Sequence, residues 1–197
     1  SAETAVTSVV STAAATTQAY QQGALYNITA GTLIGRLYSV RQPIYELYAA
    51  SGAHSQFLGY PIGEEQSAGA GRRRQSFEGG TIEYATGSTP VLLLPVRNVV
   101  LSISAGPLRM RLGETQSITA SLFAQNGGAL TDRTVTWTTS NSRVVSIEPN
   151  GAHAVLRASG GGTATVKAIS EGRESQTLSI QVAAPCCLAG EGAPNAV

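Results

Sequence analysis

The sequence predicts a mainly β protein, because its second half alternates apolar and polar residues and its first half is rich in glycine turns and tyrosine. From about Arg97 onward, apolar residues recur at every second position, as in the run Leu108, Met110 and Leu112. Each such run has one apolar and one polar face, as a strand of a two-layer sandwich requires. About seven short runs separated by turn residues predict an Ig-like antiparallel β-sandwich over residues 97–183, with Trp137 buried as its core anchor.

The first 19 residues have a different composition, since 14 of them are Ala, Thr or Ser. Such a segment cannot form a core of its own, so we expect an extended N-terminal arm over 1–19, whose larger apolar residues are Val6, Val9 and Val10. Residues 4–12 are rich in β-branched side chains and carry no charge to protect a strand edge. We therefore expect the arm to pair with a sheet, either of its own Ig-like domain or of a neighbouring subunit.

Residues 20–96 predict a small β-rich module with a short helix. The helix is expected to begin after Pro43, where a missing N–H costs nothing, and to end at Gly52. Strands are expected at 24–28, 33–40 and 81–85.

This module contains an internal echo. The segment Phe77–Ile82 resembles Tyr20–Leu25, since each has an aromatic residue, then a glycine turn, then a small residue followed by an aliphatic one. The echo predicts one full repeat and the rear half of another. At the second copy, Gly79 and Gly80 are expected to form a turn that needs positive φ or a close backbone approach.

Composition excludes several classes of function. The net charge is +1 and charged residues are 13% of the chain, which argues against a nucleic-acid binder. No apolar run approaches the roughly 20 residues of a membrane-spanning helix. With two His, one Asp and one Lys, the chain is poorly equipped for catalysis or metal binding. We therefore expect no catalytic residues, no metal and no cofactor.

The stretch from Ile44 to about Leu94 resembles the LGFP repeat, a module of bacterial cell-envelope proteins. The likeness rests on the tetrad Leu58-Gly59-Tyr60-Pro61, with Tyr in place of Phe, and on the run from Gly71 to Tyr84 that ends in FEGGTIEY. The resemblance implies contact with the envelope.

The stretch from about Val99 to Val182 resembles the group 2 bacterial Ig-like domain of intimin- and invasin-type surface proteins. The matching segments are 112–120, 135–141 and 162–168. Both resemblances imply an extracellular or cell-surface bacterial protein without catalytic residues of its own.

Candidate contacts for an envelope glycan are Arg72, Arg73 and Arg74, the only charge run, together with Tyr60 and Tyr84. The alternative is that the arginines form a solvated loop paired with Glu64 and Glu65. The carboxylates Glu64, Glu65, Glu78 and Glu83 favour structural roles over acid–base catalysis, because nothing in the sequence fixes their separation.

The Pro and Gly content of residues 184–197 predicts a linker or tail, which contains the adjacent Cys186 and Cys187. Three states are open for this pair: a vicinal disulfide, intermolecular bridges or reduced thiols.

Two functions follow from the sequence. The first is a non-enzymatic binding, adhesion or spacer module whose partner is an envelope glycan or another surface protein. The alternative is a subunit of a self-assembling surface filament, joined by strand addition through Val6, Val9 and Val10 and by the paired cysteines.

Overall fold

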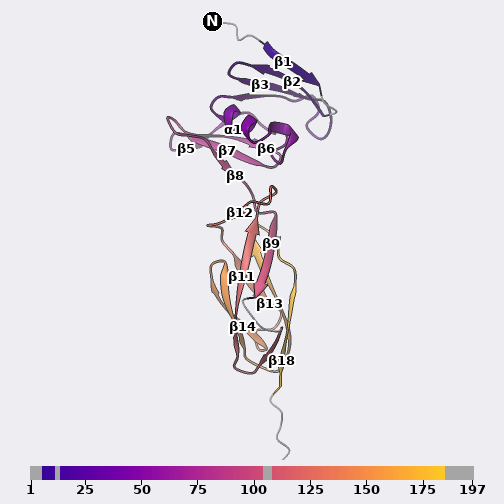
Figure 1. The fold of residues 1–197 in the computed structure, drawn as a ribbon, viewed down its shortest axis with the longest axis vertical. Helices are drawn as coiled ribbons and strands as arrows, with labels where there is room; N and C mark the ends of the chain where they lie inside the picture. Colours follow the sequence, from indigo (N-terminus) through magenta and orange to yellow (C-terminus); the bar gives the residue numbers. More distant parts are fainter. Residues whose placement is uncertain (1–5, 12–13, 104–107, 185–197) are drawn as a thin grey trace, which may run out of the picture. The chain divides into compact units, whose positions relative to one another are not determined.

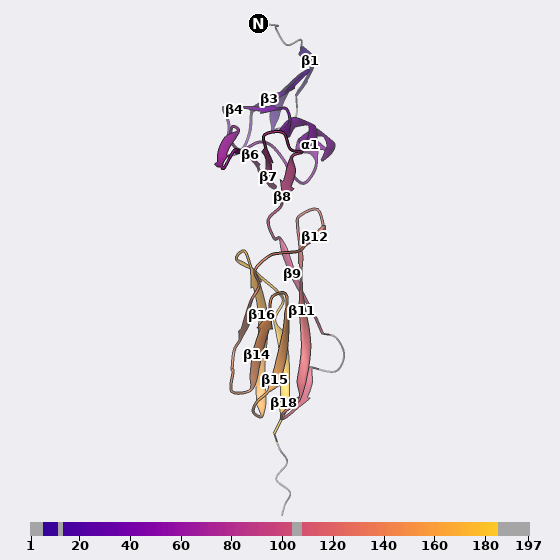
Figure 2. The ribbon, with the colours of Figure 1, turned by 90° about the vertical axis from the view of Figure 1, so that its left-hand side faces the viewer.

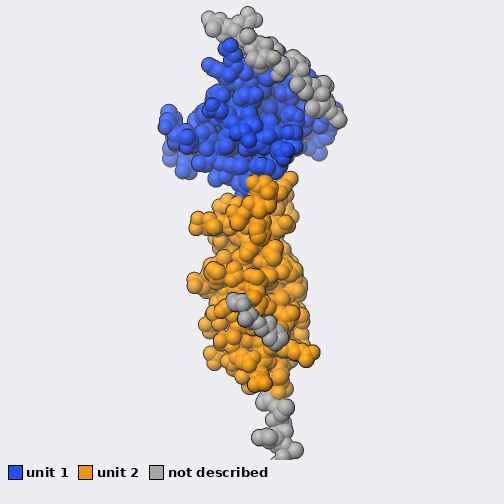
Figure 3. All heavy atoms as spheres, in the orientation of Figure 1, with its two compact units in different colours: residues 1–95 blue, residues 96–197 orange. Residues whose placement is uncertain are grey.

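The computed structural model describes the backbone of residues 6–11 and all atoms of residues 14–103 and 108–184. The chain divides into two compact units, residues 1–95 and 96–197 (Figures 1 and 3). Antiparallel β-strands dominate both units, so the predicted mainly β class is confirmed. Residues 185–197, with Cys186 and Cys187, lie outside the described residues, and the expectations for them stay predictions.

Two four-stranded antiparallel meanders make up the first unit. The strands of one, in spatial order, are β1 (Val6–Ser11), β2 (Ala15–Tyr20), β3 (Gly23–Ile28) and β4 (Leu37–Arg41). The strands of the other are β5 (Gln66–Gly69), β6 (Arg72–Phe77), β7 (Gly80–Ala85) and β8 (Val91–Leu93).

A short helix, α1 (Ile44–Ala50), lies between these two sheets and contacts β3, β4 and β7 (Figure 1). It begins after Pro43, as predicted, and buries Ile44 and Tyr48, which lie four residues apart on one helix face. Gly52, at φ +83°, turns the chain out of the helix and into the 3-10 turn η1 (Ala53–Ser55). The helix therefore supplies the apolar layer that both sheets share.

The N-terminal segment is not a separate arm. β1 pairs with β2, and β2 pairs along its whole length with β3, so both strands belong to the sheet of the first unit. In β2, Ala15 and Thr17 are buried on the face that turns toward α1. The expected pairing with the Ig-like domain is thus wrong for the described residues, because β1 pairs with β2 and β2 with β3 inside the first unit, and pairing with a neighbouring subunit stays a prediction.

The strand expected at 33–40 begins only at Leu37. Gly31 and Gly35 both have φ near +80°, which turns the preceding segment back on itself. The apolar residues Leu33 and Ile34 therefore lie in a turn, and Ile34 is 65% exposed.

The second unit is a sandwich of two sheets (Figure 2). One contains β9 (Asn98–Ile103), β11 (Thr115–Phe123), β12 (Ala129–Leu130), β15 (His153–Ala158) and β14 (Val145–Asn150). The other contains β10 (Arg109–Arg111), β18 (Leu178–Ala183), β16 (Gly162–Ser170), β13 (Thr136–Thr139) and β17 (Arg173–Glu174).

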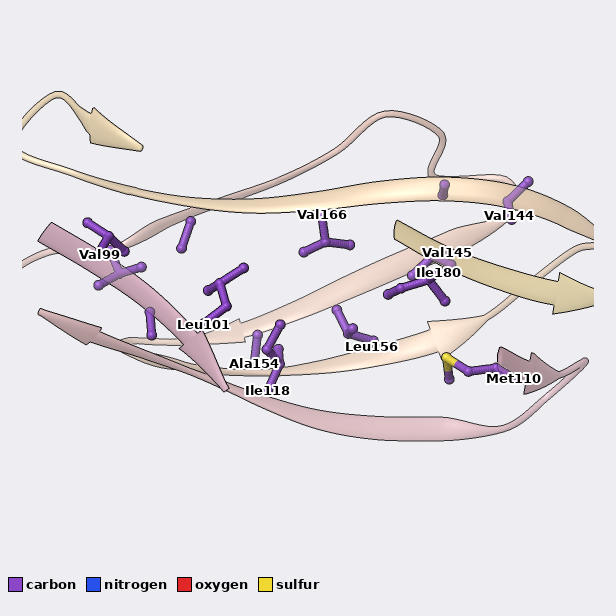
Figure 4. Packing of buried hydrophobic residues seen from close by; sticks show 14 of the residues in the cluster. Val99, Leu101, Met110, Ile118, Val144, Val145, Ala154, Leu156, Val166 and Ile180 are labelled. Atoms are coloured by element: carbon purple, nitrogen blue, oxygen red, sulfur yellow. The ribbon is translucent and has the colours of Figure 1, made fainter. Parts of the chain in front are cut away.

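The core of the second unit comes largely from residues at alternate positions of its strands. In Figure 4, side chains such as Ile118 and Leu156 from one sheet meet Val166 and Ile180 from the other. All four are at most 2% exposed, while the residues between them along each strand face outward. The period-2 pattern therefore identified the buried faces of β11, β16 and β18, whereas in the predicted run Leu108, Met110 and Leu112 only Met110 is buried.

Trp137 is less buried than the sequence predicted. The side chain packs against the core but is only partly buried, and its Nε1 donates a hydrogen bond to the Gly151 carbonyl at 3.0 Å. The indole N–H needs a polar partner, and that partner lies in the turn between β14 and β15.

We therefore expect Trp137→Ala to cost roughly 2 to 3 kcal/mol of unfolding free energy, less than the roughly 3–5 kcal/mol typical of a fully buried large side chain. Urea unfolding followed by far-UV circular dichroism checks this value. A loss below about 1 kcal/mol, or above about 5 kcal/mol, contradicts the partial burial.

Candidate functional site

The hairpin of β6 and β7 is fixed to the LGYP tetrad by its backbone. In the hairpin loop, the Gly79 N–H donates to the Leu58 carbonyl at 2.9 Å, and the Glu78 N–H donates to the Tyr60 carbonyl at 3.1 Å. A Cβ on Gly79 would lie 1.8 Å from the Phe57 carbonyl oxygen. Only glycine permits this approach, so the predicted close contact is confirmed, whereas positive φ is not needed there.

The tetrad residues are structural. Leu58 is fully buried, and Gly59 has φ +66°, a conformation that favours glycine. The Gly59 carbonyl accepts a 2.8 Å hydrogen bond from the buried Tyr48 hydroxyl. Pro61 forms a β-bridge with Phe77 at the end of β6. The tetrad therefore ties the helix to the second hairpin.

Gln75 joins the two sheets. It is 1% exposed, and its Nε2 donates to the Ser39 carbonyl at 2.8 Å and to the Gly63 carbonyl at 2.9 Å. Beside it, the Glu64 carboxylate accepts from the Ser39 N–H at 2.9 Å and from the Ser39 hydroxyl at 2.7 Å. Sequence reasoning missed Gln75 and Ser39. The signal for Gln75 was the glutamine two residues before the aromatic in both copies of the echo, Gln18 and Gln75.

An aromatic cluster fills the space around α1. Tyr48 stacks on Phe77 with ring centroids 4.4 Å apart and meets Tyr26 edge-on at 5.8 Å. His54 stacks on Tyr60 at 4.8 Å. Burial raises the pKa of Tyr26 to about 12 and raises that of Tyr48 further. Tyr60 is thus part of this cluster rather than of the arginine surface.

The same cluster predicts a pH effect on stability. Burial against Tyr26 and Tyr60 lowers the pKa of His54 below its ordinary value of 6.5. As the pH falls through about 6.5, the unfolded chain takes up a proton at this side chain before the folded chain does, so stability falls as pH falls. Unfolding free energies at pH 7 and pH 5 measure the loss, and we expect His54→Gln to reduce it. An equal loss in the variant contradicts the assignment.

The three arginines do not form one surface. Alternation along β6 places Arg73 on the same sheet face as Gln75 and Phe77, and places Arg72 and Arg74 on the opposite face. The cross-strand register of the hairpin, together with its glycine turns, determines which side chain each arginine contacts. The predicted contact set is therefore split into three places: Tyr60, Arg73 with Tyr84, and Arg72 with Arg74.

Arg73 and Tyr84 meet at Glu65. The Arg73 guanidinium forms an ion pair with the Glu65 carboxylate, and the Tyr84 hydroxyl donates to Glu65 Oε1 at 2.9 Å. The hydrogen bond to Glu65 raises the pKa of Arg73. The pKa of Tyr84 is also raised, first by loss of water contact and then by Glu65. Of the three arginines, Arg73 is thus the one that pairs with Glu65, as the alternative interpretation of the triplet predicted.

The opposite face of this sheet is the outer face. There Arg72 forms a 2.9 Å ion pair with Glu83, whereas Arg74 has no ion pair among the described residues. Arg74 borders a hollow of about 270 Å³, whose other lining residues are Ile62, Gly63, Glu64, Gln66 and Ser76. This hollow combines a guanidinium, a carboxylate, an amide, a hydroxyl and a half-exposed aliphatic side chain, since Ile62 is 42% exposed.

The four carboxylates weighed as acid–base candidates all have partners. Glu64, Glu65, Glu78 and Glu83 each accept a hydrogen bond or form an ion pair within the first unit. In the described part of the chain, no three His, Cys, Asp or Glu side chains gather as they would around a metal ion. No described helix is both long and apolar enough to cross a bilayer. The expectation that the chain has no catalytic residues stays a prediction.

The candidate assembly contacts lie partly outside the described residues. Val6, Val9 and Val10 belong to β1, an end strand of its sheet, while Cys186 and Cys187 lie beyond the described range. Their role in assembly also stays a prediction.

Comparison with protein families identifies one match. Residues 58–95 match the LGFP repeat, and this segment contains the tetrad, the hairpin and the outer-face hollow. It covers 38 of the 197 residues, from Leu58 to Pro95. No curated protein matches the chain.

Solved structures resemble the chain only distantly. Domains 4 and 5 of the S-layer protein SbsC are 14% identical, with a TM-score of 0.40, and the match covers 59% of this chain and 79% of that one. The Escherichia coli adhesin FdeC is 15% identical, with a TM-score of 0.39, covering 64% and 48%. The Yersinia pseudotuberculosis adhesin InvE is 16% identical, with a TM-score of 0.33, covering 45% and 27%. The chain thus spans less than two thirds of both adhesin structures, and likeness at these values transfers no function.

Proposed function

We propose that this chain is a non-enzymatic module of a bacterial cell surface, and that its first unit binds an anionic envelope glycan through the outer face of the β5–β8 sheet. The observation that carries the proposal is Arg74, which has no ion pair among the described residues and borders a hollow within the segment that matches the LGFP repeat. The envelope location follows from the resemblance to the LGFP repeat.

The chemistry of the hollow suits a charged sugar. The Arg74 guanidinium presents paired N–H donors that fit a carboxylate or a phosphate. The Gln66 amide and the Ser76 hydroxyl offer donors and acceptors for ring hydroxyls, and Ile62 offers an apolar contact for the carbon face of a sugar. Glu64 also borders the hollow, but both of its oxygens accept hydrogen bonds from Ser39.

The second unit would serve as a spacer or adhesive domain. Its support is a closed apolar core between two sheets, together with the resemblance to group 2 bacterial Ig-like domains. This role needs no bound ligand within the unit, because a packed sandwich keeps its own shape.

The glycan proposal predicts that Arg74→Gln reduces co-sedimentation of the full chain with purified cell wall several-fold. The matched control is Arg109→Gln, which removes one positive charge from an exposed strand residue of the second unit and should leave sedimentation unchanged. Binding should also weaken with added salt. If wild-type protein stays in the supernatant, or if both variants lose binding equally, the outer face is not a specific site.

A second candidate function is a filament subunit, favoured by the position of β1 at the end of its sheet. β1 pairs with β2 on one side, and its residues carry no charge that would protect the other edge. Light scattering of the full chain with and without residues 1–14 tests this idea. A strictly monomeric full chain at high concentration contradicts it.

A further inference from the structure

The two copies of the sequence echo are equivalent hairpins. β2 and β3 are joined by Gln21 and Gln22, with Tyr20 paired to Gly23, while β6 and β7 are joined by Glu78 and Gly79, with Phe77 paired to Gly80. Counting outward from the loops gives four pairs of equivalent residues on one face: Gln18 and Gln75, Tyr20 and Phe77, Gly23 and Gly80, Leu25 and Ile82.

In the second hairpin this face is covered. Gln75, Phe77 and Ile82 are each at most 2% exposed. Residues 44–63 cover this face, and successive parts of this segment make three contacts with it. Tyr48 stacks on Phe77, Leu58 lies 3.3 Å from a Cβ placed on Gly80, and the Gly63 carbonyl accepts from Gln75.

In the first hairpin the equivalent face is open. The side chains of Gln18, Tyr20 and Leu25 are only partly buried, whereas their counterparts are fully buried. A hollow of about 420 Å³ lies here, and its lining includes Tyr20, Gly23, Leu25, Ser39 and Arg41. The opposite face, with Ala24, Tyr26 and Val40, is the one that packs toward α1.

We propose that this open face of the first sheet is a docking site for the helix-and-tetrad half of another LGFP-type repeat, a segment equivalent to residues 44–63, supplied by a second polypeptide. Tyr20 offers the ring on which an aromatic residue of the incoming helix stacks, as Tyr48 stacks on Phe77. Leu25, which lines the hollow, offers an apolar contact to the leucine of the incoming tetrad, whereas Gly23 is closed by the Val40 carbonyl oxygen of its own sheet, 2.2 Å from the position of a Cβ. Gln18 offers an amide to an incoming carbonyl, as Gln75 does to Gly63.

The chain's own segment 44–63 is not the occupant, because it already lies between its two sheets. The docking site shares no lining residue with the glycan hollow, although Ser39 of the former donates a hydrogen bond to Glu64 of the latter. The test of one proposal therefore does not decide the other.

The test uses the full chain and a fluorescent synthetic peptide with the sequence of residues 43–64. We expect saturable binding by fluorescence anisotropy, and slower amide hydrogen exchange confined to residues 18–25 and 39–41. A peptide carrying both Tyr48→Ala and Leu58→Ala should bind at least tenfold more weakly. These changes are in the peptide, so they leave the folding of the protein unaffected.

Two protein variants locate the contact. Leu25→Glu places a carboxylate in the hollow and should abolish peptide binding, while Leu112→Glu, at a half-exposed leucine of the second unit, should leave it intact. A peptide that binds too weakly in solution is tested by fusing it through a flexible linker to the N-terminus, which gives an effective concentration in the mM range.

Unchanged exchange at residues 18–25 in that fusion overturns the proposal. So does protection of the same residues by soluble cell-wall fragments but not by the peptide, since the face would then be a glycan site.

Discussion

Gly79→Ala should unfold the first unit while leaving the second intact. The added Cβ would lie 1.8 Å from the Phe57 carbonyl oxygen, and that carbonyl belongs to the backbone that leads into the tetrad. Neither the backbone at Gly79 nor the backbone at Phe57 can move away without breaking the hydrogen bonds from the hairpin loop to Leu58 and Tyr60. We expect a loss of about 3 kcal/mol or more, at or above the upper end for overpacking.

The chain itself provides the readout for Gly79→Ala. All seven tyrosines lie between residues 20 and 84, in the first unit, and the single tryptophan lies in the second. Urea unfolding followed by tyrosine absorbance and by tryptophan fluorescence therefore reports on each unit separately. Gly63→Ala is the matched control, since its Cβ meets nothing closer than 3.9 Å and should cost less than about 0.5 kcal/mol. Equal tyrosine transitions in the two variants contradict the close approach.

Tyr48→Ala should be comparably severe. Tyr48 is fully buried, stacks on Phe77 and meets Tyr26, so its loss leaves a cavity between the two sheets. Large-to-small changes of this kind cost about 3–5 kcal/mol. Because the helix is the layer shared by both sheets, we expect the whole first unit to lose its cooperative transition in the tyrosine signal.

Tyr48→Phe separates packing from hydrogen bonding. It keeps the ring but removes the hydroxyl that donates to the Gly59 carbonyl at 2.8 Å. Leaving a buried carbonyl without its donor costs about 1–3 kcal/mol. If the phenylalanine variant is as unstable as the alanine variant, the ring contacts are not what stabilises the unit.

Local patterns predicted much of the fold. The alternation of apolar and polar residues predicted the buried faces of β11, β16 and β18, and Pro43 and Gly52 predicted the two ends of α1. The pairing of β2 was not predictable in the same way. Its small side chains suit many partners, and the sheet that it joins is determined by the hairpin at Gln21 and Gln22, together with the burial of Ala15 against the helix layer.

The sequence predicted candidate residues for the site but not how they are arranged. The triplet was correctly noticed as the only charge run, yet only the strand register shows that Arg73 meets Glu65 while Arg72 meets Glu83. Gln75 is a buried polar residue whose partners, Ser39 and Gly63, lie far from it in sequence. The repeated glutamine marks Gln75 itself, but local patterns do not identify the distant partners of such hydrogen bonds.

The second and the last strand of the sandwich along the chain, β10 and β18, have a mechanical consequence. β10 runs parallel to β18, with Arg109, Met110 and Arg111 paired to Gln181, Val182 and Ala183. Tension that reaches β10 from one end of this domain and β18 from the other draws these neighbouring strands past each other lengthwise. The hydrogen bonds between them then bear the load together rather than opening one after another, as they would in a hairpin peeled from its ends. A domain that is pulled at its two ends gains resistance to rupture from this strand arrangement, without any additional bond.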